Sequence, residues 1–288
     1  MNKIISVAKP HGFCGNNKFG VIAAIEKAKQ AAKQFPGKVY MLGEIVHNQH
    51  VVDELKKECG VKIVASLDQI PNGEVLIIRA HGAIPEIFKR AKEKKLKIVD
   101  ATCPLVTQAH KEILKLASQG KKIVYVASKK NHDEAVGAAG EAPECVILTT
   151  LKELKKLEIE NPKNTVLITQ TTLSTIETET ELESLQERYS DLTIKPHICP
   201  ATTDRQKAVI ALAKQNDLVI IVGSPTSSNS NRLKDVVIET GGKAYIVDTA
   251  AELQKSWFEG KEKIAVSSGA STPEHLLEEV ITKIKTYN

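Results

Sequence analysis

Short apolar runs rich in β-branched residues alternate with longer amphipathic stretches along the chain. The apolar runs predict buried strands at 39–42, 75–78, 123–126, 166–169, 219–222 and 264–266. Apolar residues at helical spacing predict helices between them, among others at 20–34, 106–118 and 204–214. Strands that alternate with helices in this way are typical of an α/β fold with parallel sheets.

The same pattern occurs three times. Each repeat begins with a cysteine and runs through a helix and a strand into a polar loop. The cysteines are Cys14, Cys103 and Cys199, and the loops hold His47, His132 and Ser228 in the same order. A second strand then leads into another polar loop and a helix start, at 76–86, 167–177 and 265–274. We therefore expect a trefoil of three pseudo-repeated α/β units, 1–102, 103–198 and 199–288, rather than two domains.

Polar residues gather directly after the predicted strands. They are His47, His81, His132, Thr171, Ser227, Ser228, Asn229 and Ser271. In parallel sheets, ligands bind beyond the carboxyl ends of the strands. Three units around a pseudo-threefold axis would direct these loops and the three cysteines at one central cavity.

Composition narrows the classes of partner. The net charge of +5 lies mostly on lysines of predicted helix faces, and it favours a small anionic substrate. The chain has five arginines and 4% aromatic residues, so we expect no nucleic-acid partner. Because no apolar run could span a bilayer and the N-terminus lacks the pattern of a secretory signal, we expect a cytoplasmic protein with no membrane partner.

The five cysteines suggest a metal centre rather than a disulfide framework, since the compartment is reducing and no two are closer than 42 residues. A helix dipole stabilises the thiolate of a cysteine just before the helix. Structural zinc needs four ligands, whereas three thiolates on a [4Fe–4S] cluster leave one iron open. We therefore expect Cys14, Cys103 and Cys199 to hold a central cluster, and Cys59 and Cys145 to be buried apolar residues.

The polar loops have the chemistry of an anion site. The run 227–231 offers hydroxyl, amide and backbone donors before a helix expected near Arg232. The segment His132-Asp133-Glu134 places acids beside a candidate anion ligand, His132, and Glu134, shielded from water, can serve as a general acid. Asp133 is expected to point elsewhere. The other histidines are interpreted as structural: His11, His50, His110, His197 and His275.

Seven spaced segments carry a resemblance to a known family. They are GFC at 12–14, EIVHN at 44–48, RAHG at 79–82, DATCPLV at 100–106, TQTTLS at 169–174, the segment 198–206 with IC at 198–199, ATT at 201–203 and RQ at 205–206, and SSNSNRL at 227–233. With them the chain resembles the 4-hydroxy-3-methylbut-2-enyl diphosphate reductase family, the LytB-type iron–sulfur reductases of the methylerythritol phosphate pathway to isoprenoids. The resemblance extends over nearly the whole chain.

The resemblance implies a fold, a cofactor and a reaction. Around an oxygen-sensitive [4Fe–4S] cluster on Cys14, Cys103 and Cys199, the diphosphate would be bound by His47, His81, His132, Ser227, Ser228, Asn229 and Ser271. Thr171 and Glu134 would serve the substrate hydroxyl and the proton relay. The reaction would be reductive dehydroxylation of (E)-4-hydroxy-3-methylbut-2-enyl diphosphate to isopentenyl and dimethylallyl diphosphate. Electrons would come from a ferredoxin or flavodoxin, which agrees with the lack of a G-x-G-x-x-G nicotinamide motif.

The chain differs from the family pattern in three places. Residues 15–19 lengthen the loop after Cys14, Asp133 and Ala135 stand where proline and valine are usual, and Pro200 follows the third cysteine. Two other functions remain open. One is the same cluster chemistry on a different allylic or propargylic substrate, and the other is a non-catalytic iron–sulfur redox or oxygen sensor. A sensor needs neither a diphosphate site nor a proton donor, so the polar loops disfavour it.

Overall fold

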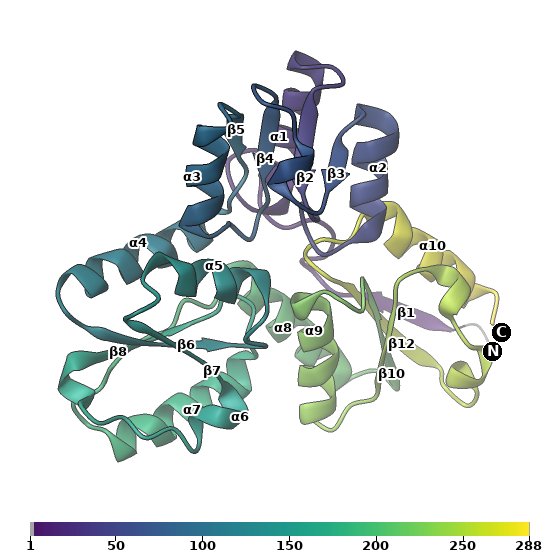
Figure 1. The fold of residues 1–288 in the computed structure, drawn as a ribbon. Coiled ribbons are helices and arrows are strands. Elements are labelled where there is room, and N and C mark those ends of the chain that lie inside the picture. Colours follow the sequence, from purple (N-terminus) through teal and green to yellow (C-terminus); the bar gives the residue numbers. More distant parts are fainter. Residues whose placement is uncertain (1–2, 288) are drawn as a thin grey trace. The chain divides into compact units, whose positions relative to one another are not determined.

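The structure, a computed structural model, describes residues 3–287 and contains three four-stranded parallel sheets. The chain divides into two compact units. The first combines the chain up to Gly15, His47–Val51 and the chain from Pro200 onward, and the second comprises Asn16–Val46 and Val52–Cys199. Figure 1 labels the helices and strands and colours the chain from purple at the N-terminus to yellow at the C-terminus.

The first unit contains one sheet with the strand order β1-β12-β10-β11. Its strands are β1 (Ile4–Val7), β10 (Leu218–Val222), β11 (Ala244–Val247) and β12 (Lys263–Ser268). Its helices are α8 (Pro200–Ala213), α9 (Ser228–Glu239) and α10 (Glu274–Lys285), with short 3₁₀ helices η3 (Ala250–Glu252) and η4 (Lys255–Phe258).

Alternate residues of β10 and β12 face opposite sides of this sheet. Ile220 and Val266 pack in a cluster with apolar residues of α10, whereas Ile221 and Ala265 pack with residues of α8 and α9. Helices therefore cover both faces of the central strands (Figure 1). Burial on both sides explains why these strands are continuous apolar runs rather than alternating ones.

The second unit contains two sheets, ordered β3-β2-β4-β5 and β7-β6-β8-β9. The strands are β2 (Val39–Leu42), β3 (Lys62–Val64), β4 (Val75–Ile78), β5 (Lys97–Asp100), β6 (Lys122–Ala127), β7 (Val146–Thr150), β8 (Thr165–Thr169) and β9 (Thr193–Lys195). The accompanying helices are α1 (Gly20–Gln34), α2 (Gln49–Cys59), α3 (Pro85–Glu93), α4 (Pro104–Ser118), α5 (Asp133–Glu141), α6 (Leu151–Leu154), α7 (Thr175–Arg188), η1 (Leu67–Gln69) and η2 (Pro162–Asn164).

Helices cover both faces of the β6–β8 sheet as well. Val124 and Leu167 pack in a cluster with residues of α6 and α7, whereas Ile123, Tyr125 and Ile168 pack with residues of α4 and α5. Tyr125 is fully buried in the latter cluster. The candidate site residues at the start of α5 lie next to this cluster.

The predicted α/β class, with one parallel sheet for each repeat, is confirmed. All three sheets have the same strand order. The strands β2, β3, β4 and β5 of one sheet correspond to β6, β7, β8 and β9 of the second and to β10, β11, β12 and β1 of the third. The last series ends with a strand from the beginning of the chain, since β1 pairs with β12. The boundaries at 102/103 and 198/199 stay a prediction, and the pairing adds that residues 4–7 belong to the third sheet.

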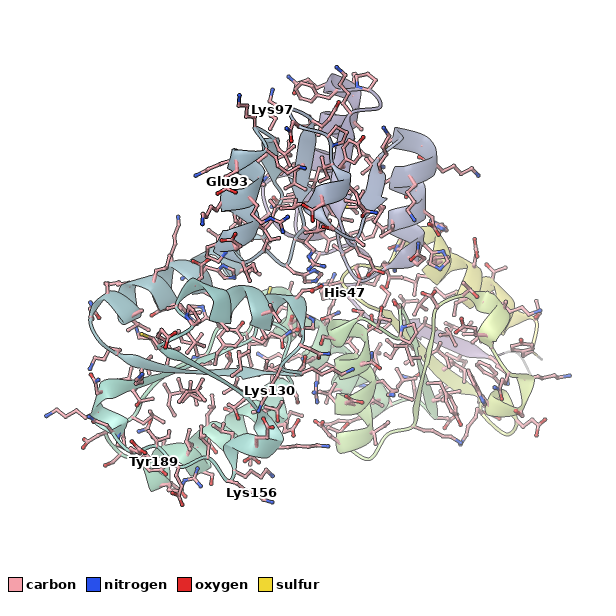
Figure 2. All side chains as sticks on the ribbon, in the orientation of Figure 1. His47, Glu93, Lys97, Lys130, Lys156 and Tyr189 are labelled. Carbon is pink, nitrogen blue, oxygen red and sulfur yellow. The ribbon has the colours of Figure 1, made fainter. Side chains whose placement is uncertain are left out.

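The lysines contribute to the exposed surface, as their sequence positions predict. Lys97, Lys130 and Lys156 are exposed, and their side chains extend from the ribbon in Figure 2. Among the helices of residues 3–287, none combines the length and the apolar character needed to cross a membrane.

Candidate active site

The three candidate ligand cysteines have equivalent places in their sheets. Cys14 follows β1, Cys103 follows β5 and Cys199 follows β9, and these strands hold the same edge position in the three sheets. Each thiol is half-buried. The predicted repeat therefore extends to the residues that carry the cysteines.

A backbone hydrogen bond of the same kind holds each cysteine. The amide of Cys14 donates to the carbonyl oxygen of Ala270 at 2.9 Å. The amide of Cys103 donates in the same way to Ala80 at 3.0 Å, and that of Cys199 to Thr171 at 2.9 Å. Ala270, Ala80 and Thr171 each lie two residues after the end of a central strand, namely β12, β4 and β8. Each cysteine is thus tied to the polar loop of its own sheet.

The helix-start geometry predicted for the cysteines holds for two of them. Cys103 is the N-cap residue of α4, and Cys199 immediately precedes α8. Cys14 is separated from α1 by a tight turn in which Asn16 and Phe19 exchange two backbone hydrogen bonds. The longer loop at 15–19 therefore forms its own turn, and five residues stand between Cys14 and the first residue of α1.

The other two cysteines differ from their predicted state. Cys59 and Cys145 are half-buried rather than buried. Cys145 packs against the apolar cluster between β6 and α5. At Cys59, the last residue of α2, partial burial raises the pKa of the thiol. Neither follows the edge strand of a sheet, so neither belongs to the equivalent set.

The loops after the first central strand of each sheet are also equivalent. His47, His132 and Ser227 are each the fifth residue after the end of β2, β6 and β10. His132 and Ser227 are N-cap residues of α5 and α9 and accept hydrogen bonds from backbone amides of the first turn. Polar side chains thus stand at the carboxyl end of each sheet, where ligands bind in folds of this type.

The first turn of α9 has the features of an anion site. The helix begins at Ser228, so the Ser/Asn run forms its first turn and does not precede it as predicted. Asn229 is 7% exposed, and neither its amide nitrogen nor its carbonyl oxygen has a hydrogen-bond partner among the described residues. Because buried polar groups are normally paired, this carboxamide is suited to a ligand. Ser271, on the loop after β12, lies with its hydroxyl 3.5 Å from the carbonyl oxygen of His47.

Two glycines allow α9 to approach the sheet. A Cβ atom at Gly223 or Gly269 would overlap the hydroxyl of Ser230, which is fully buried. We expect Gly269→Ala to lower the thermal unfolding midpoint, because overpacking of this kind costs about 1–3 kcal/mol. The midpoint can be measured by circular dichroism. Adding Ser230→Ala removes the overlapping oxygen and should recover most of the loss, whereas an unchanged midpoint in Gly269→Ala alone would contradict this packing.

His132 is held in one tautomer. Its Nδ1 atom accepts from the backbone amide of Glu134 at 3.2 Å, and the amide nitrogen of Gln170 also lies 3.2 Å away. Since an N–H group can only donate, Nδ1 is the acceptor and Nε2 carries the proton. In this tautomer the Nε2–H group is a neutral donor of the kind that can bind an anion. The ring of His81 lies 5.7 Å from that of His132, edge to face.

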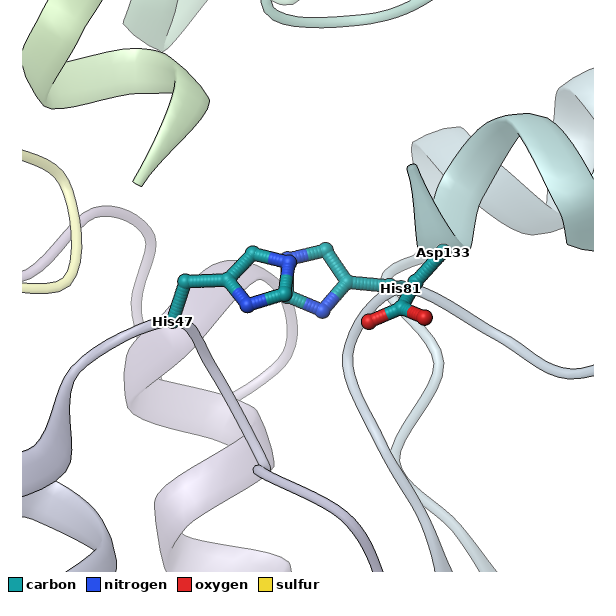
Figure 3. Close-up of side chains that lie close together, drawn as sticks. All are labelled: His47, His81 and Asp133. Atoms are coloured by element: carbon teal, nitrogen blue, oxygen red, sulfur yellow. The ribbon is translucent and has the colours of Figure 1, made fainter. Parts of the chain in front are cut away.

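Asp133 points away from Glu134, as predicted, and binds Arg79. Both carboxylate oxygens contact the guanidinium, at 2.7 and 2.8 Å. A ring nitrogen of His81 and a carboxylate oxygen of Asp133 lie within 4.8 Å (Figure 3). The ion pair joins the start of α5 to the loop after β4.

Glu134 and Thr171, predicted to act together, are in contact. Glu134 is 2% exposed. One carboxyl oxygen, Oε1, accepts from the backbone amide of Thr171 at 2.8 Å, and Oε2 lies 2.9 Å from the Thr171 hydroxyl. Burial raises the pKa of the Glu134 carboxyl, although the hydrogen bonds from Thr171, Tyr125 and Gln170 act in the opposite direction. A carboxyl group in this state can hold a proton and release it.

Sequence reasoning missed two residues around Glu134. Tyr125 donates its phenol hydroxyl to Glu134 Oε1 at 3.3 Å, and Gln170 is fully buried beside His132. Gln170 follows β8 and could have been found by the rule that singled out Thr171. Tyr125 lies inside a strand, where its apolar neighbours indicate only core packing.

The histidines interpreted as structural mostly pair with carboxylates. His11 pairs with Glu274 at 3.0 Å, His50 with Asp248 at 3.2 Å, His110 with Glu141 at 2.8 Å and His197 with Glu112 at 2.7 Å. His275 is exposed. For the first four, the pairing supports that interpretation.

Comparison with known proteins identifies close relatives. The family model described as "LytB protein" matches residues 5–285. A protein of Neisseria meningitidis named 4-hydroxy-3-methylbut-2-enyl diphosphate reductase is 42% identical over 290 residues, covering 99% of this chain and 88% of the relative. A protein of Desulfotalea psychrophila with the same name is 43% identical over 279 residues, covering 96% and 87%.

Two solved structures are similar over nearly the whole chain. The E-1-hydroxy-2-methyl-but-2-enyl-4-diphosphate reductase of Plasmodium falciparum matches with a TM-score of 0.92 and 35% identity, covering 98% of this chain and 88% of that one. An (E)-4-hydroxy-3-methyl-but-2-enyl diphosphate reductase, described as the terminal enzyme of the non-mevalonate pathway, matches with a TM-score of 0.66 and 32% identity, covering 99% of both chains.

Proposed function

This chain belongs to the LytB protein family, and from that membership we propose that it reduces (E)-4-hydroxy-3-methylbut-2-enyl diphosphate to isopentenyl and dimethylallyl diphosphate. The reaction removes the hydroxyl group as water and consumes two electrons and two protons. The observation that carries the proposal is the buried Glu134 carboxyl in contact with Thr171. A reductive dehydroxylase needs such a proton donor, whereas an electron carrier or a sensor does not.

We infer that Cys14, Cys103 and Cys199 bind a [4Fe–4S] cluster with one open iron. The donor set fits, because three thiols in equivalent places offer the soft ligands that iron–sulfur clusters require. When bound, such a cluster supplies electrons singly and a Lewis-acidic iron. A ferredoxin or flavodoxin is the proposed electron donor. The cytoplasm is the proposed location, since thiols stay reduced there.

We propose that the diphosphate is bound by hydrogen bonds rather than by fixed charges. Ser227, Ser228, Asn229 and Ser271, together with His47, His81 and His132, are the proposed binding residues. The N-terminus of α9 supports this role, because its backbone N–H groups and dipole favour anions. The unpartnered Asn229 carboxamide and the Nε2–H of His132 add neutral donors.

Glu134 and Thr171 are the proposed proton relay. The Glu134 carboxyl lies within hydrogen-bond distance of the Thr171 hydroxyl, which can pass a proton on to the leaving hydroxyl group. Burial keeps bulk water away from this pair, since both residues are less than 7% exposed. The raised pKa of the Glu134 carboxyl keeps the proton available at a higher pH than for an ordinary glutamate.

An anaerobic assay tests the proposed function. Protein purified without oxygen, reduced by methyl viologen and given (E)-4-hydroxy-3-methylbut-2-enyl diphosphate should form both isoprenoid diphosphates. Substrates that lack the diphosphate, or that carry another allylic or propargylic alcohol, serve as comparisons. A protein that contains a full cluster but leaves the diphosphate unreduced would contradict the proposal.

Replacing Asn229 by alanine should weaken binding without destabilising the protein. Loss of one charge-assisted hydrogen bond costs about 1.5–3 kcal/mol, so affinity should fall roughly ten- to a hundredfold by calorimetry. The ligand-free protein should be equally or more stable, because the variant removes a buried carboxamide without partners. A matched control is Asn216→Ala, whose side-chain amide donates to the carbonyl oxygen of Leu212, outside the proposed site. Unchanged affinity in Asn229→Ala would exclude this residue from the anion site.

A further inference from the structure

Tyr125 is a buried tyrosine whose phenol reaches the proposed proton donor. It lies in the middle of β6 and is fully buried among the apolar residues that join this strand to α4 and α5. Its hydroxyl donates a long hydrogen bond, 3.3 Å, to Oε1 of Glu134. A buried tyrosine hydroxyl normally needs a partner, and here the partner is the carboxyl group itself.

The carboxyl group receives its hydrogen bonds unequally. Oε1 accepts from the Thr171 amide at 2.8 Å, which can only donate, and from the Tyr125 phenol at 3.3 Å. The side-chain amide of Gln170 also donates a hydrogen bond to this carboxyl group. Burial and the neighbouring Glu134 raise the pKa of the phenol well above its usual range, so the phenol keeps its proton. Oε2 contacts the Thr171 hydroxyl at 2.9 Å. A proton on the neutral carboxyl therefore belongs on Oε2, facing that hydroxyl.

We propose that Tyr125 is a positioning residue for the proton relay: by occupying Oε1, its phenol directs the transferable proton of Glu134 to Oε2 and the Thr171 hydroxyl. This inference rests on the role of Glu134 in the proposed function. It extends that role by naming a residue, outside the polar loops, that selects which oxygen donates.

Packing explains how a tyrosine fits at this place in the core. Ala135 and Ala138, on the inner side of α5, are fully buried in the same cluster as Tyr125. Their small side chains leave room for a large ring between the helix and the strand. A valine at position 135 would add two methyl groups to this space. The Tyr125 ring and the small Ala135 side chain therefore complement each other.

The charged surroundings of Glu134 are limited. Besides Tyr125, its own helix contributes His132 and Asp133, and Asp133 is paired with Arg79 from the loop after β4. The loop after β8 contributes the neutral Thr171 and Gln170. On α4, His110 pairs with Glu141 at the end of α5, and Glu112 pairs with Lys195 and His197.

The test is Tyr125→Phe, which removes only the hydroxyl. Without the phenol donor the ionised carboxylate loses a hydrogen bond, so the pKa of Glu134 rises. In the kcat–pH profile, the pH at which activity falls on the alkaline side should then rise by about one unit. This corresponds to the lower end of the free energy range for a hydrogen bond to a charged group. Infrared titration of the carboxyl band that Glu134→Gln abolishes should show the same shift in the anaerobic holoprotein, without turnover.

Two further variants separate positioning from stability. Tyr125→Leu removes the ring and should lower stability while giving the same shift. Tyr40→Phe removes a phenol on β2 whose hydroxyl bonds to Lys62, and it should shift neither titration. Identical infrared midpoints in wild type and Tyr125→Phe would overturn the inference. Failure of the wild type to reduce the diphosphate would instead overturn the proposed function, while the infrared shift still decides the role of Tyr125.

Discussion

Replacing Cys14, Cys103 or Cys199 by serine is expected to yield protein that folds but contains no stable cluster and has no detectable reductase activity. Each residue supplies one of three proposed thiolate ligands, and a serine hydroxyl is a hard ligand that stays protonated near neutral pH. Iron and acid-labile sulfide analysis of anaerobically purified protein, together with visible absorbance, measures the loss. Circular dichroism should show an intact fold, because each side chain is half-buried at a sheet edge.

The remaining cysteines provide matched controls. Cys59→Ala and Cys145→Ala change equally half-buried thiols outside the equivalent set, so iron content and activity should match the wild type. A serine variant at position 14, 103 or 199 that retained its full iron content would refute that residue as a ligand. Loss of iron in a normally folded Cys59→Ala variant would refute the assignment of the cluster to the other three cysteines.

The sequence predicted the centre of every sheet and missed the edges. The six predicted strands are β2, β4, β6, β8, β10 and β12, which are the two central strands of the three sheets. Nearly all of their residues are buried, so they read as uninterrupted apolar runs. The missed strands lie at the edges and include exposed or half-buried residues, as in β5 and β9. Half-exposed strands of three to five residues carry too little apolar character to stand out from loops.

The position of β1 could not be predicted from the order of elements along the chain. The repeat suggested that residues 4–7 belong with the helix and strands that follow them. Instead, β1 pairs with β12, some 260 residues away in the chain, and takes the place that β5 and β9 take in the other sheets. A pairing between distant strands depends on the assembled sheet, and local patterning contains no information about it.

Residues that follow strands were the candidates that the sequence could identify, and their roles stay predictions. Thr171 and Glu134 were expected to act together, and their side chains are in contact. Tyr125 was missed because its neighbours on β6 are apolar, and a tyrosine in such a run is normally interpreted as core. Its hydroxyl acquires a partner only when α5 packs on the sheet, which is a consequence of tertiary structure.

Glu134→Gln should retain cluster and substrate binding but reduce kcat at least about 10²-fold, the usual scale for loss of a general acid. The amide keeps the shape of the side chain and an acceptor for the Thr171 amide, but it has no acidic proton to donate. Because burial raises the pKa of this carboxyl, wild-type kcat should fall as pH rises through that pKa. The Glu134→Gln variant should have a low kcat that shows no such fall with increasing pH. Anaerobic steady-state kinetics across pH measure both effects.

Glu141→Gln is the matched control. It makes the same substitution on the same helix, at a residue that is also largely buried, and the amide oxygen can still accept from His110. Its kcat and pH profile should match the wild type. If Glu134→Gln reduced the diphosphate at the wild-type rate, the proton would have to come from another donor. A parallel loss of affinity and iron in Glu134→Gln would instead assign this residue to binding, because a proton donor acts on kcat alone.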